Sequence, residues 1–481
     1  MILVVSLMII FVVFTAFFTK KLNIPLILIS LLIGIIFGSD VTGIIYFDDA
    51  QLTKRVADIA LIFVLFSGGF SIKYSDLKTV MKPVLLLSTV GVVITAVVSG
   101  FVFWLISGWD LTKSILLCSI ISSTDAAAVF SILRTKQLNK DIALITEAES
   151  ASNDPMAVVL TTFIIQLMIA AEVNIFSSII VFFWQFVGGT SIGILIGFLA
   201  TYPFNKIRDI DIRYYYLFLI GVILFTYGLA NSIGVSGMLS VFFAGLIMGK
   251  SQLPHKNGLT SFIEILSFIS YTGLFILLGL LVFPRSFSKI WLFGILLFVL
   301  ITFVGRPIAV FLCTFFGKLS LKDKIFLNWS GIRGAVPVVL ATYPMAVGID
   351  NDHQIFNTVF FAVTLSIIIQ GTTIAKLADM FGLAVKAKNK VKQKMELVTV
   401  HDTNYEMIEI FIDDEIYQGE CKISDLSLPA GTTITMINRE DTIIAPSGQT
   451  VILPGDTLYV LVNKEKVHEC INEILGMFPR K

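Results

Sequence analysis

Long apolar stretches separated by short polar loops follow one another from residue 1 to residue 381. A helix needs about 20 mostly apolar residues to cross the hydrocarbon core of a bilayer. One candidate, 234–249, is short and rich in glycine, which favours an irregular segment there. The pattern predicts a polytopic all-α membrane protein with about thirteen transmembrane helices, at 1–19, 23–39, 56–72, 83–107, 111–133, 142–171, 174–203, 214–231, 234–249, 259–283, 287–316, 325–348 and 354–381.

Basic residues are unevenly distributed among the loops between these segments. If the N-terminus lies outside, every inside loop is basic, whereas three of the outside loops have no basic residue. Loops rich in lysine and arginine remain on the cytoplasmic side of a membrane. The sequence therefore predicts an outside N-terminus and places the part of the chain after residue 381 in the cytoplasm.

The segments also divide into two halves of six, at about 1–171 and 214–381, on either side of a single segment. Polar breaks occupy corresponding places in the halves, as SSTD (122–125) in the fifth segment and GIRG (331–334) in the twelfth. Corresponding breaks are typical of inverted-repeat transporters, whose substrate site lies near the bilayer midplane. Unwound backbone at that depth must line a cavity or be buried in protein.

The pattern changes after residue 381. A lysine-rich linker over 384–395 suits contact with anionic membrane lipid. Beyond it, the short alternating runs EMIEIFI, TTITMI, TVILP and TLYVLV are separated by the turn signals PAG, PSG and PGD, which predicts strands. An amphipathic helix is expected over 464–477. The sequence thus predicts a transmembrane domain over 1–383 and a small cytoplasmic α+β domain over 396–481.

Composition agrees with a chain embedded in a membrane. Apolar residues make up 56% of it and charged residues only 14%, against about 25% in soluble domains. The 35 basic and 34 acidic residues nearly cancel, which argues against a nucleic-acid partner. The four cysteines form no C-x-x-C pair, so neither a disulfide framework nor a zinc site is implied.

Carboxylates interrupt the apolar segment 142–171. A charge at bilayer depth costs at least about 2.5–3.5 kcal/mol, which makes a functional site the default interpretation. If the segment is a helix, four polar residues share one face: Glu149, Ser150, Asn153 and Asp154. A patch of oxygen donors with one net carboxylate suits an alkali cation or a proton.

Other apolar segments carry further polar groups. Asp125, in the SSTD break, supplies a second carboxylate, and proton exchange is favoured where two carboxylates lie close together. Arg306 and Arg333 need anionic partners at this depth because a guanidinium does not deprotonate. The sequence predicts a structural ion pair between Glu149 and Arg333, with Arg306 in the same network. Asp154 is left as the group that binds and releases an ion.

Three stretches resemble the signatures of the cation–proton antiporter family, in the branch with an Asn-Asp pair: SSTDAAAVFSILR, EAESASNDPMAVV and WSGIRGAVPVVLA. They are similar to those of bacterial NhaP-type potassium or sodium/proton antiporters, and the resemblance covers roughly residues 1–385. It implies a homodimer of thirteen-helix protomers. Each protomer would have a dimerisation domain and a core domain with two unwound, crossing helices.

The same resemblance implies roles for individual residues. Five are expected around the transported cation and proton: Asp154, Asn153, Ser150, Thr124 and Asp125. Asp154 would be the exchanging carboxylate, supported by Asn153, while Ser150 and the main chain of Thr124 would ligate K⁺ or Na⁺. The family often has an acid in the third helix, where LFSGG places Ser67, and this departure removes one possible ligand.

The C-terminal part resembles the RCK-C (TrkA C-terminal) regulatory domain in LPAGTTITMINRED, in IIAPSGQTVILPGDTLYVLV and in its terminal helix. The resemblance implies a small-molecule regulator, in some cases cyclic di-AMP. The G-x-G-x-x-G fingerprint of the nucleotide-binding half often found with this domain is absent. No other cofactor is expected.

Together these features predict a monovalent cation/proton antiporter of the bacterial inner or plasma membrane, and not an enzyme. Asn153 stands where a second acid would make exchange electrogenic, so one-for-one exchange is expected. The NDPMA context and the RCK-like domain favour K⁺, with a Na⁺/H⁺ antiporter as the alternative. A ligand-gated cation channel is a remote alternative, but the sequence contains no carbonyl filter such as TVGYG. An intramembrane aspartyl protease would need a Gly-x-Gly-Asp context, which neither Asp125 nor Asp154 has.

Overall fold

The computed structural model divides the chain into two compact units, Met1–Val385 and Lys386–Lys481. It describes residues 2–19, 26–72, 80–133, 136–170, 175–206, 211–251, 253–315, 317, 319–350, 352–386, 404–412, 421–426, 428–439, 442–463, 466–467, 469–470 and 474. Most of the linker expected over 384–395 and most of the helix expected over 464–477 lie outside these residues.

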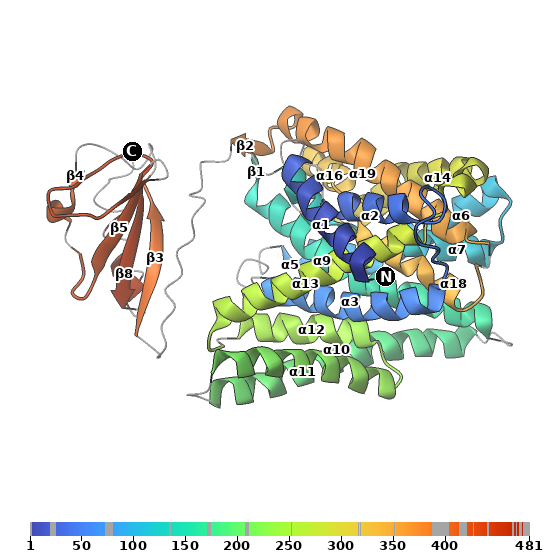
Figure 1. The fold of residues 1–481 in the computed structure, drawn as a ribbon, viewed down its shortest axis with the longest axis horizontal. Helices are drawn as coiled ribbons and strands as arrows, with labels where there is room; N and C mark the ends of the chain where they lie inside the picture. Colours follow the sequence, from blue (N-terminus) through green and yellow to red (C-terminus); the bar gives the residue numbers. More distant parts are fainter. Residues whose placement is uncertain are drawn as a thin grey trace. The chain divides into compact units, whose positions relative to one another are not determined.

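The first unit is helical (Figure 1), and each predicted apolar segment falls on one helix or on two or three in succession. A short strand, β1 (Lys136–Leu138), pairs with β2 (Ala384–Lys386). The helices are α1 (Ile2–Thr19), α2 (Leu26–Phe37), α3 (Ala50–Ser71), α5 (Met81–Leu86), α6 (Val92–Ser107), α7 (Leu111–Ile120), α8 (Ala126–Ile132), α9 (Lys140–Ile169), α10 (Ile175–Lys206), α11 (Ile212–Ser232), α12 (Gly237–Lys250), α13 (Lys256–Leu280), α14 (Phe287–Leu300), α15 (Arg306–Cys313), α16 (Leu321–Trp329), α17 (Ala335–Leu340), α18 (Thr342–Ala346) and α19 (Gln354–Met380).

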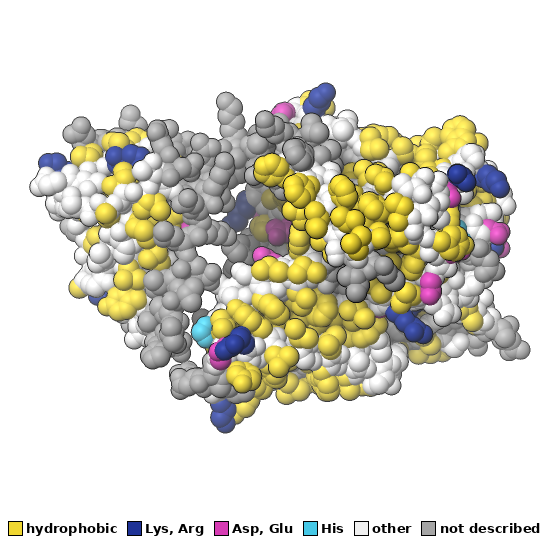
Figure 2. Space-filling view, in the orientation of Figure 1, with side chains coloured by type: hydrophobic (Ala, Val, Ile, Leu, Met, Phe, Trp, Pro, Cys, Tyr) yellow, Lys and Arg dark blue, Asp and Glu magenta, His cyan; other side chains and the backbone are white. Residues whose placement is uncertain are grey.

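The surface of this unit is apolar. Figure 2 shows hydrophobic side chains spread over its visible face, and Phe14, Phe17, Trp184 and Leu195 are among the large apolar residues that are exposed. Soluble monomers rarely expose contiguous apolar patches of this extent. Within the described residues, seven helices are long and apolar enough to cross a membrane, and shorter apolar helices accompany them. The unit is a helical membrane protein, and the number of thirteen crossings stays a prediction.

The first group of helices in this unit, α1–α3 and α10–α13, is joined through glycines. Figure 1 shows α3, α12 and α10 side by side. A Cβ atom added at Gly245 of α12 would come within 3.2 Å of the Phe70 backbone nitrogen of α3, and one at Gly279 of α13 within 2.8 Å of the Gly34 Cα of α2. Small residues let membrane helices approach this closely. The expectation of an irregular segment at 234–249 is wrong: α12 is a regular helix, because its glycines serve packing rather than bending.

The second group comprises α5–α9 and α14–α19, and it contains two π-helical turns. One turn, η2 (Leu87–Gly91), joins α5 to α6, and the other, η4 (Ile301–Gly305), joins α14 to α15. They interrupt the fourth and eleventh predicted segments, which correspond in the two halves. Each turn contacts the opposite half: a Cβ at Gly91 would lie 3.6 Å from Cys313 Sγ, and one at Gly305 would lie 2.9 Å from the Thr95 carbonyl oxygen. These paired irregularities support the predicted inverted repeat.

The two groups meet where α9, α17 and α18 pack against α3, α10, α12 and α13. Polar side chains take part in this contact. The Tyr343 hydroxyl of α18 donates to the Asp58 carboxylate of α3, and Gln185 Nε2 of α10 donates to Gln166 Oε1 of α9 at 3.0 Å. Within the first group, glycines let the helix backbones approach each other closely. Between the two groups, the hydrogen bonds described here are made by side chains.

The second unit contains a four-stranded antiparallel sheet in the order β3-β8-β5-β6, as the alternating runs predicted. The central strand β8 is buried on both faces, since consecutive residues such as Leu458, Tyr459 and Val460 are all covered. Apolar side chains of β3, β5 and β8 form its core. The strands are β3 (Tyr405–Phe411), β5 (Thr433–Arg439), β6 (Thr442–Ile444) and β8 (Thr457–Asn463), with β4 (Cys421–Lys422) paired to β7 (Val451–Ile452) in a separate ladder.

A buried ion pair holds the PGD turn before β8. Asp456 is fully buried and accepts from Arg439 Nε and Nη2, both at 2.8 Å, and from the Leu453 backbone nitrogen at 2.8 Å. Removing one partner of a buried pair costs about 3–5 kcal/mol. We expect Arg439→Met to destabilise the second unit by an amount at the low end of that range, because the Arg439 side chain is 30% exposed to solvent. Limited proteolysis of the full chain should then cut within 386–481 faster than in wild type.

The matched control is Arg213→Met, which removes the same charge from an exposed pair with Asp211. It should leave the cleavage rate within 386–481 unchanged. Equal protection of that region in the Arg439→Met and wild-type chains would show that the buried pair contributes little to the stability of the second unit.

Candidate functional site

Two broken helices meet in the second helix group. The first break separates α7, which ends at Ile120, from α8, and the second separates α16, which ends at Trp329, from α17. The break predicted at SSTD is thus confirmed. The Asp125 backbone nitrogen donates to the Ile332 carbonyl at 2.8 Å. A Cβ at Gly334 would lie 2.6 Å from Asp125 Cγ, so only glycine allows the breaks to pack together at this point.

The polar face of α9 is bonded to the first break. Asn153 Nδ2 donates to Thr124 Oγ1 at 2.7 Å, and Asn153 Oδ1 accepts from the Thr124 backbone nitrogen at 3.3 Å. The Ser150 hydroxyl donates to the Thr124 carbonyl at 2.8 Å and accepts from the Ala126 backbone nitrogen at 2.9 Å. These bonds replace those that an unbroken helix would make, because buried backbone polar groups require partners. The predicted role of Ser150 and Thr124 as cation ligands stays a prediction.

The predicted ion pair between Glu149 and Arg333 is wrong. Both carboxylate oxygens of Glu149 accept from Arg306, with Nη2 at 3.0 Å from Oε2 and Nη1 bonded to Oε1. Arg306 Nη2 also donates to the Leu327 carbonyl at 3.2 Å, near the end of α16. Arg306 therefore holds α9, α15 and α16 together at a buried point.

Arg333, in the second break, instead faces the first break. Its Nη1 donates to the carbonyls of Ser122 and Ser123 at 2.6 and 2.9 Å. These carbonyls lie in the unwound backbone between α7 and α8, where buried backbone oxygens need a donor. The first break thus takes the place that Glu149 was expected to occupy, which explains why the second break contains a buried arginine.

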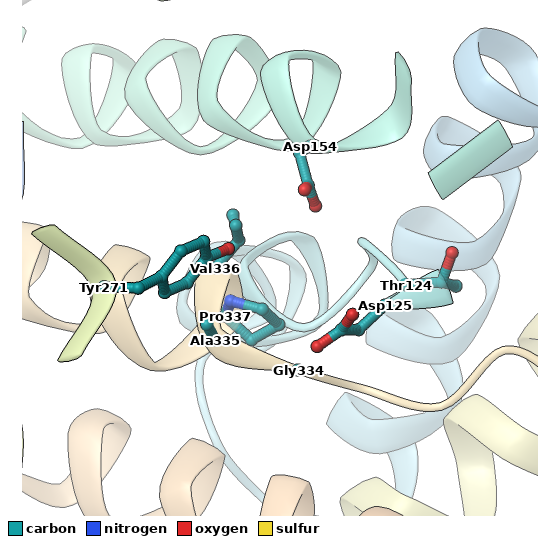
Figure 3. A pocket seen from close by; sticks show the side chains of 8 residues that line it. All are labelled: Thr124, Asp125, Asp154, Tyr271, Gly334, Ala335, Val336 and Pro337. Carbon is teal, nitrogen blue, oxygen red and sulfur yellow. The ribbon is translucent and has the colours of Figure 1, made fainter. Parts of the chain in front are cut away.

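A pocket lies where the two breaks face α9. The pocket is small: it leaves about 20 Å³ for the centre of a water-sized group, where a single water needs about 10–15 Å³. In Figure 3 the Asp154 carboxyl points from α9 into the space between Tyr271 on one side and Thr124 and Asp125 on the other. The remaining lining residues come from α17 and the residue before it: Gly334, Ala335, Val336 and Pro337.

The Asp154 carboxyl is incompletely satisfied. Its Oδ1 is buried and makes no hydrogen bond of ordinary geometry with the described residues; the Ser123 hydroxyl lies near enough to interact with the carboxyl but is itself in no such bond. A buried carboxylate oxygen without a donor is costly. A proton or a cation bound there would remove that cost.

Asp125, the second carboxyl of the pocket, has a different environment. Its Oδ1 accepts from the Ala128 backbone nitrogen at 3.1 Å and caps the N-terminus of α8. The partial positive charge of a helix N-terminus stabilises a carboxylate. The structure therefore separates the two acids of the pocket: Asp125 is stabilised by a helix end, while Asp154 presents an oxygen without a donor.

Sequence reasoning missed Tyr271, which reaches the pocket from α13. The segment 259–283 was treated as an apolar span, and its polar run Ser270-Tyr271-Thr272 was the signal that could have marked it. Ser67 lies half-buried on α3 and is not among the residues that line the pocket.

Comparisons with known proteins agree with this architecture. The family model described as sodium/hydrogen exchanger, transmembrane, matches residues 7–379, and the model of the TrkA-C domain matches residues 422–475. A K⁺/H⁺ antiporter NhaP2 from Shewanella sp. strain ANA-3 is 32% identical over 464 residues, which are 96% of this chain and 80% of that protein. A K⁺/H⁺ antiporter NhaP from Alkalimonas amylolytica is 31% identical over 85% of this chain and 71% of its own length.

A solved structure supports the same assignment. The sodium proton antiporter MjNhaP1 from Methanocaldococcus jannaschii, determined at pH 8, superimposes with a TM-score of 0.69 at 25% identity. The match covers 79% of this chain and 99% of that one. The chain therefore belongs to the sodium/hydrogen exchanger family, with a TrkA-C domain after its transmembrane part.

Proposed function

We propose that this protein exchanges a monovalent cation for a proton across the membrane, with Asp154 as the carboxylate that binds both. The buried Asp154 oxygen without a donor, in a pocket formed by two broken helices, is the observation that carries this proposal. Discontinuous helices supply carbonyls and helix ends to ions at the midplane of transporters. Thr124 and Asp125, at the edge of the first break, are the nearest such groups.

Exchange follows from competition for one carboxylate. Asp154 binds a proton or a dehydrated cation, but not both at once, so each ion displaces the other. A bare charge is costly in the low-dielectric interior, so the helices that carry Asp154 move readily past the other group only when an ion is bound. Ser150 and Asn153 keep the Thr124 backbone in place next to the carboxylate during this step.

One-for-one, electroneutral exchange is the stoichiometry that we propose. Asp125 is stabilised as an ion by the N-terminus of α8, and Glu149 is neutralised by Arg306. Asn153 adds no charge of its own. Asp154 is then left as the single group whose charge changes in each half of the cycle.

We propose K⁺ as the main cation, supported by the two NhaP-type relatives that are named K⁺/H⁺ antiporters. The similarity to a solved sodium proton antiporter favours Na⁺ as a second cation. Serine at position 67, in place of the family's acid, adds no carboxylate and does not line the pocket, whose carboxyls are those of Asp154 and Asp125. A site with few charged ligands is compatible with the larger and more easily dehydrated K⁺.

The TrkA-C domain supports a regulatory role for residues 396–481, with a small molecule such as cyclic di-AMP as ligand. Bacterial relatives and the basic inside loops support a location in the bacterial plasma membrane with this domain in the cytoplasm. A homodimer is proposed on the family resemblance alone.

The test uses purified full-length protein in liposomes that contain a pH-sensitive dye and an acidic interior. We expect a pulse of external K⁺ to alkalinise the interior, at a rate that saturates as the cation concentration rises. A pulse of Na⁺ should do the same more weakly. When no protonophore is added, the membrane potential should not change during exchange, because one cation enters for each proton that leaves. Cation entry that generates a potential and does not move protons would support the channel alternative instead.

A further inference from the structure

Tyr271 differs from the other residues of the pocket in the helix group that supplies it. Thr124, Asp125, Asp154 and residues 334–337 all belong to the group with the broken helices. Tyr271 comes from α13, which packs on α2 and α3. The pocket is thus lined by both groups, and a relative movement of the groups changes the distance between Tyr271 and Asp154.

The Tyr271 ring is held firmly. It stacks on Phe275, one turn later on α13, with ring centroids 5.6 Å apart and ring planes 1° from parallel. Phe275 is itself buried. The Gly279–Gly34 contact described above fixes α13 against α2 one turn further along. The position of the phenol is therefore set mainly by its own helix group, although α13 also contacts α17 of the other group.

The hydroxyl faces both carboxylates. Figure 3 shows the Tyr271 ring directed into the pocket across from Asp125, with Asp154 above the gap between them. Tyr271 lines the same pocket as both carboxyls. A phenol oxygen is an acceptor as well as a donor, and it adds an oxygen ligand without adding a charge.

We infer that the Tyr271 hydroxyl is a cation ligand from the opposite wall of the pocket and that it favours the larger alkali cation. An ion held at Asp154 and the Thr124 edge contacts the far wall only if it is large enough to reach it. Selectivity between cations follows from cavity size and ligand number. K⁺ therefore gains the Tyr271 oxygen, whereas Na⁺ stays on the Asp154 side. This inference rests on the proposed function, because it deepens the description of the same site.

Tyr271→Phe tests it, because this change keeps the ring that stacks on Phe275 and removes only the oxygen. In the liposome assay we expect the K⁺ concentration for half-maximal exchange to rise about 5- to 10-fold, the range of one neutral hydrogen-bond-like contact. The half-maximal Na⁺ concentration and the maximal rate should change by less than about twofold. Tyr216→Phe is the matched control, since Tyr216 stacks on Phe262 at 4.6 Å and does not line the pocket.

The second measurement is protection of detergent-solubilised protein against heat unfolding by K⁺ or Na⁺, with choline as the reference cation. We expect K⁺ to raise the Tm of wild type and of Tyr216→Phe more than that of Tyr271→Phe. If wild type shows antiport and Tyr271→Phe keeps the wild-type K⁺ and Na⁺ constants, the ligand assignment fails and the proposed function stands. If wild type shows no antiport, the proposed function fails. In that case the heat-protection measurement alone tests the assignment of Tyr271 as a cation ligand. A smaller K⁺-induced rise in Tm in Tyr271→Phe than in wild type supports the assignment, and an equal rise, or none in either protein, overturns it.

Discussion

Replacing Asp154 with asparagine is expected to reduce cation-driven proton exchange by at least about 100-fold, to the background of protein-free liposomes. Asparagine keeps the size of the side chain but removes both the negative charge and the exchangeable proton. A 100-fold loss corresponds to about 2.8 kcal/mol, since each 1.4 kcal/mol is a factor of ten, and this is the size of one lost contact to a charged group. The dye assay described above measures this directly, at saturating K⁺ and over a range of external pH.

Glu147→Gln is the matched control for this variant. Glu147 is a carboxylate on the same helix, but it is exposed and lies away from the pocket. The control should therefore exchange at the wild-type rate. Both variants are checked for a single symmetric peak by size-exclusion chromatography. Exchange that survives in Asp154→Asn would remove Asp154 from the central role and point to Asp125, the second carboxyl of the pocket.

The second large effect is expected from Glu149→Gln, which leaves Arg306 buried without a counter-ion. Arg306 is buried, and both Glu149 oxygens accept from it. Breaking such a pair by removing one partner costs about 3–5 kcal/mol. This is a large share of the 5–15 kcal/mol that stabilises a typical folded protein. We expect a low yield of folded protein and a clearly lower Tm in detergent.

Double variants identify the partner of Glu149. Replacing both charges with neutral residues removes the uncompensated ion, so Glu149→Gln with Arg306→Met should recover part of the lost Tm. Glu149→Gln with Arg333→Met should not, because Arg333 stabilises the carbonyls of Ser122 and Ser123 in the first break. Recovery with Arg333→Met, and none with Arg306→Met, would contradict the pairing seen in the structure.

Features that depend on local sequence were predictable. The helices follow from runs of apolar residues, and the break at 122–125 follows from consecutive residues that compete with the backbone for hydrogen bonds. The strands of the second unit follow from alternation between turn signals. The shared face of Glu149, Ser150, Asn153 and Asp154 needs only the period of a helix. Each of these signals is contained in a few neighbouring residues.

Features that depend on packing between distant segments were not predictable. Arg306 and Arg333 both lie in apolar segments and could each have paired with Glu149. Only the positions of α7, α15 and α16 determine that Arg306 forms the ion pair. Tyr271 joins the pocket because α13 packs against α17, which lines it. The only charge in its own segment, Glu264, lies about two turns away and does not mark the tyrosine. The regular geometry of α12 likewise follows from the close approach of α3, which the glycine content alone does not reveal.

The π-helical turn η4 places a constraint on the length of the chain. It ends at Gly305, so Arg306 is the first residue after it. Each residue of an α-helix advances the side chains by about 100°, and a π turn accommodates one more residue than an α turn would. A chain with one residue deleted from 301–305 could therefore continue as an unbroken α-helix with Arg306 still directed toward Glu149. A residue inserted beyond the one that the π turn already absorbs would instead rotate Arg306 by about 100° away from Glu149. The length of this helix, and by symmetry of the helix containing η2, is thus restricted in one direction: single-residue deletions within the π turn should be tolerated better than single-residue insertions, which should be as harmful as loss of the arginine itself.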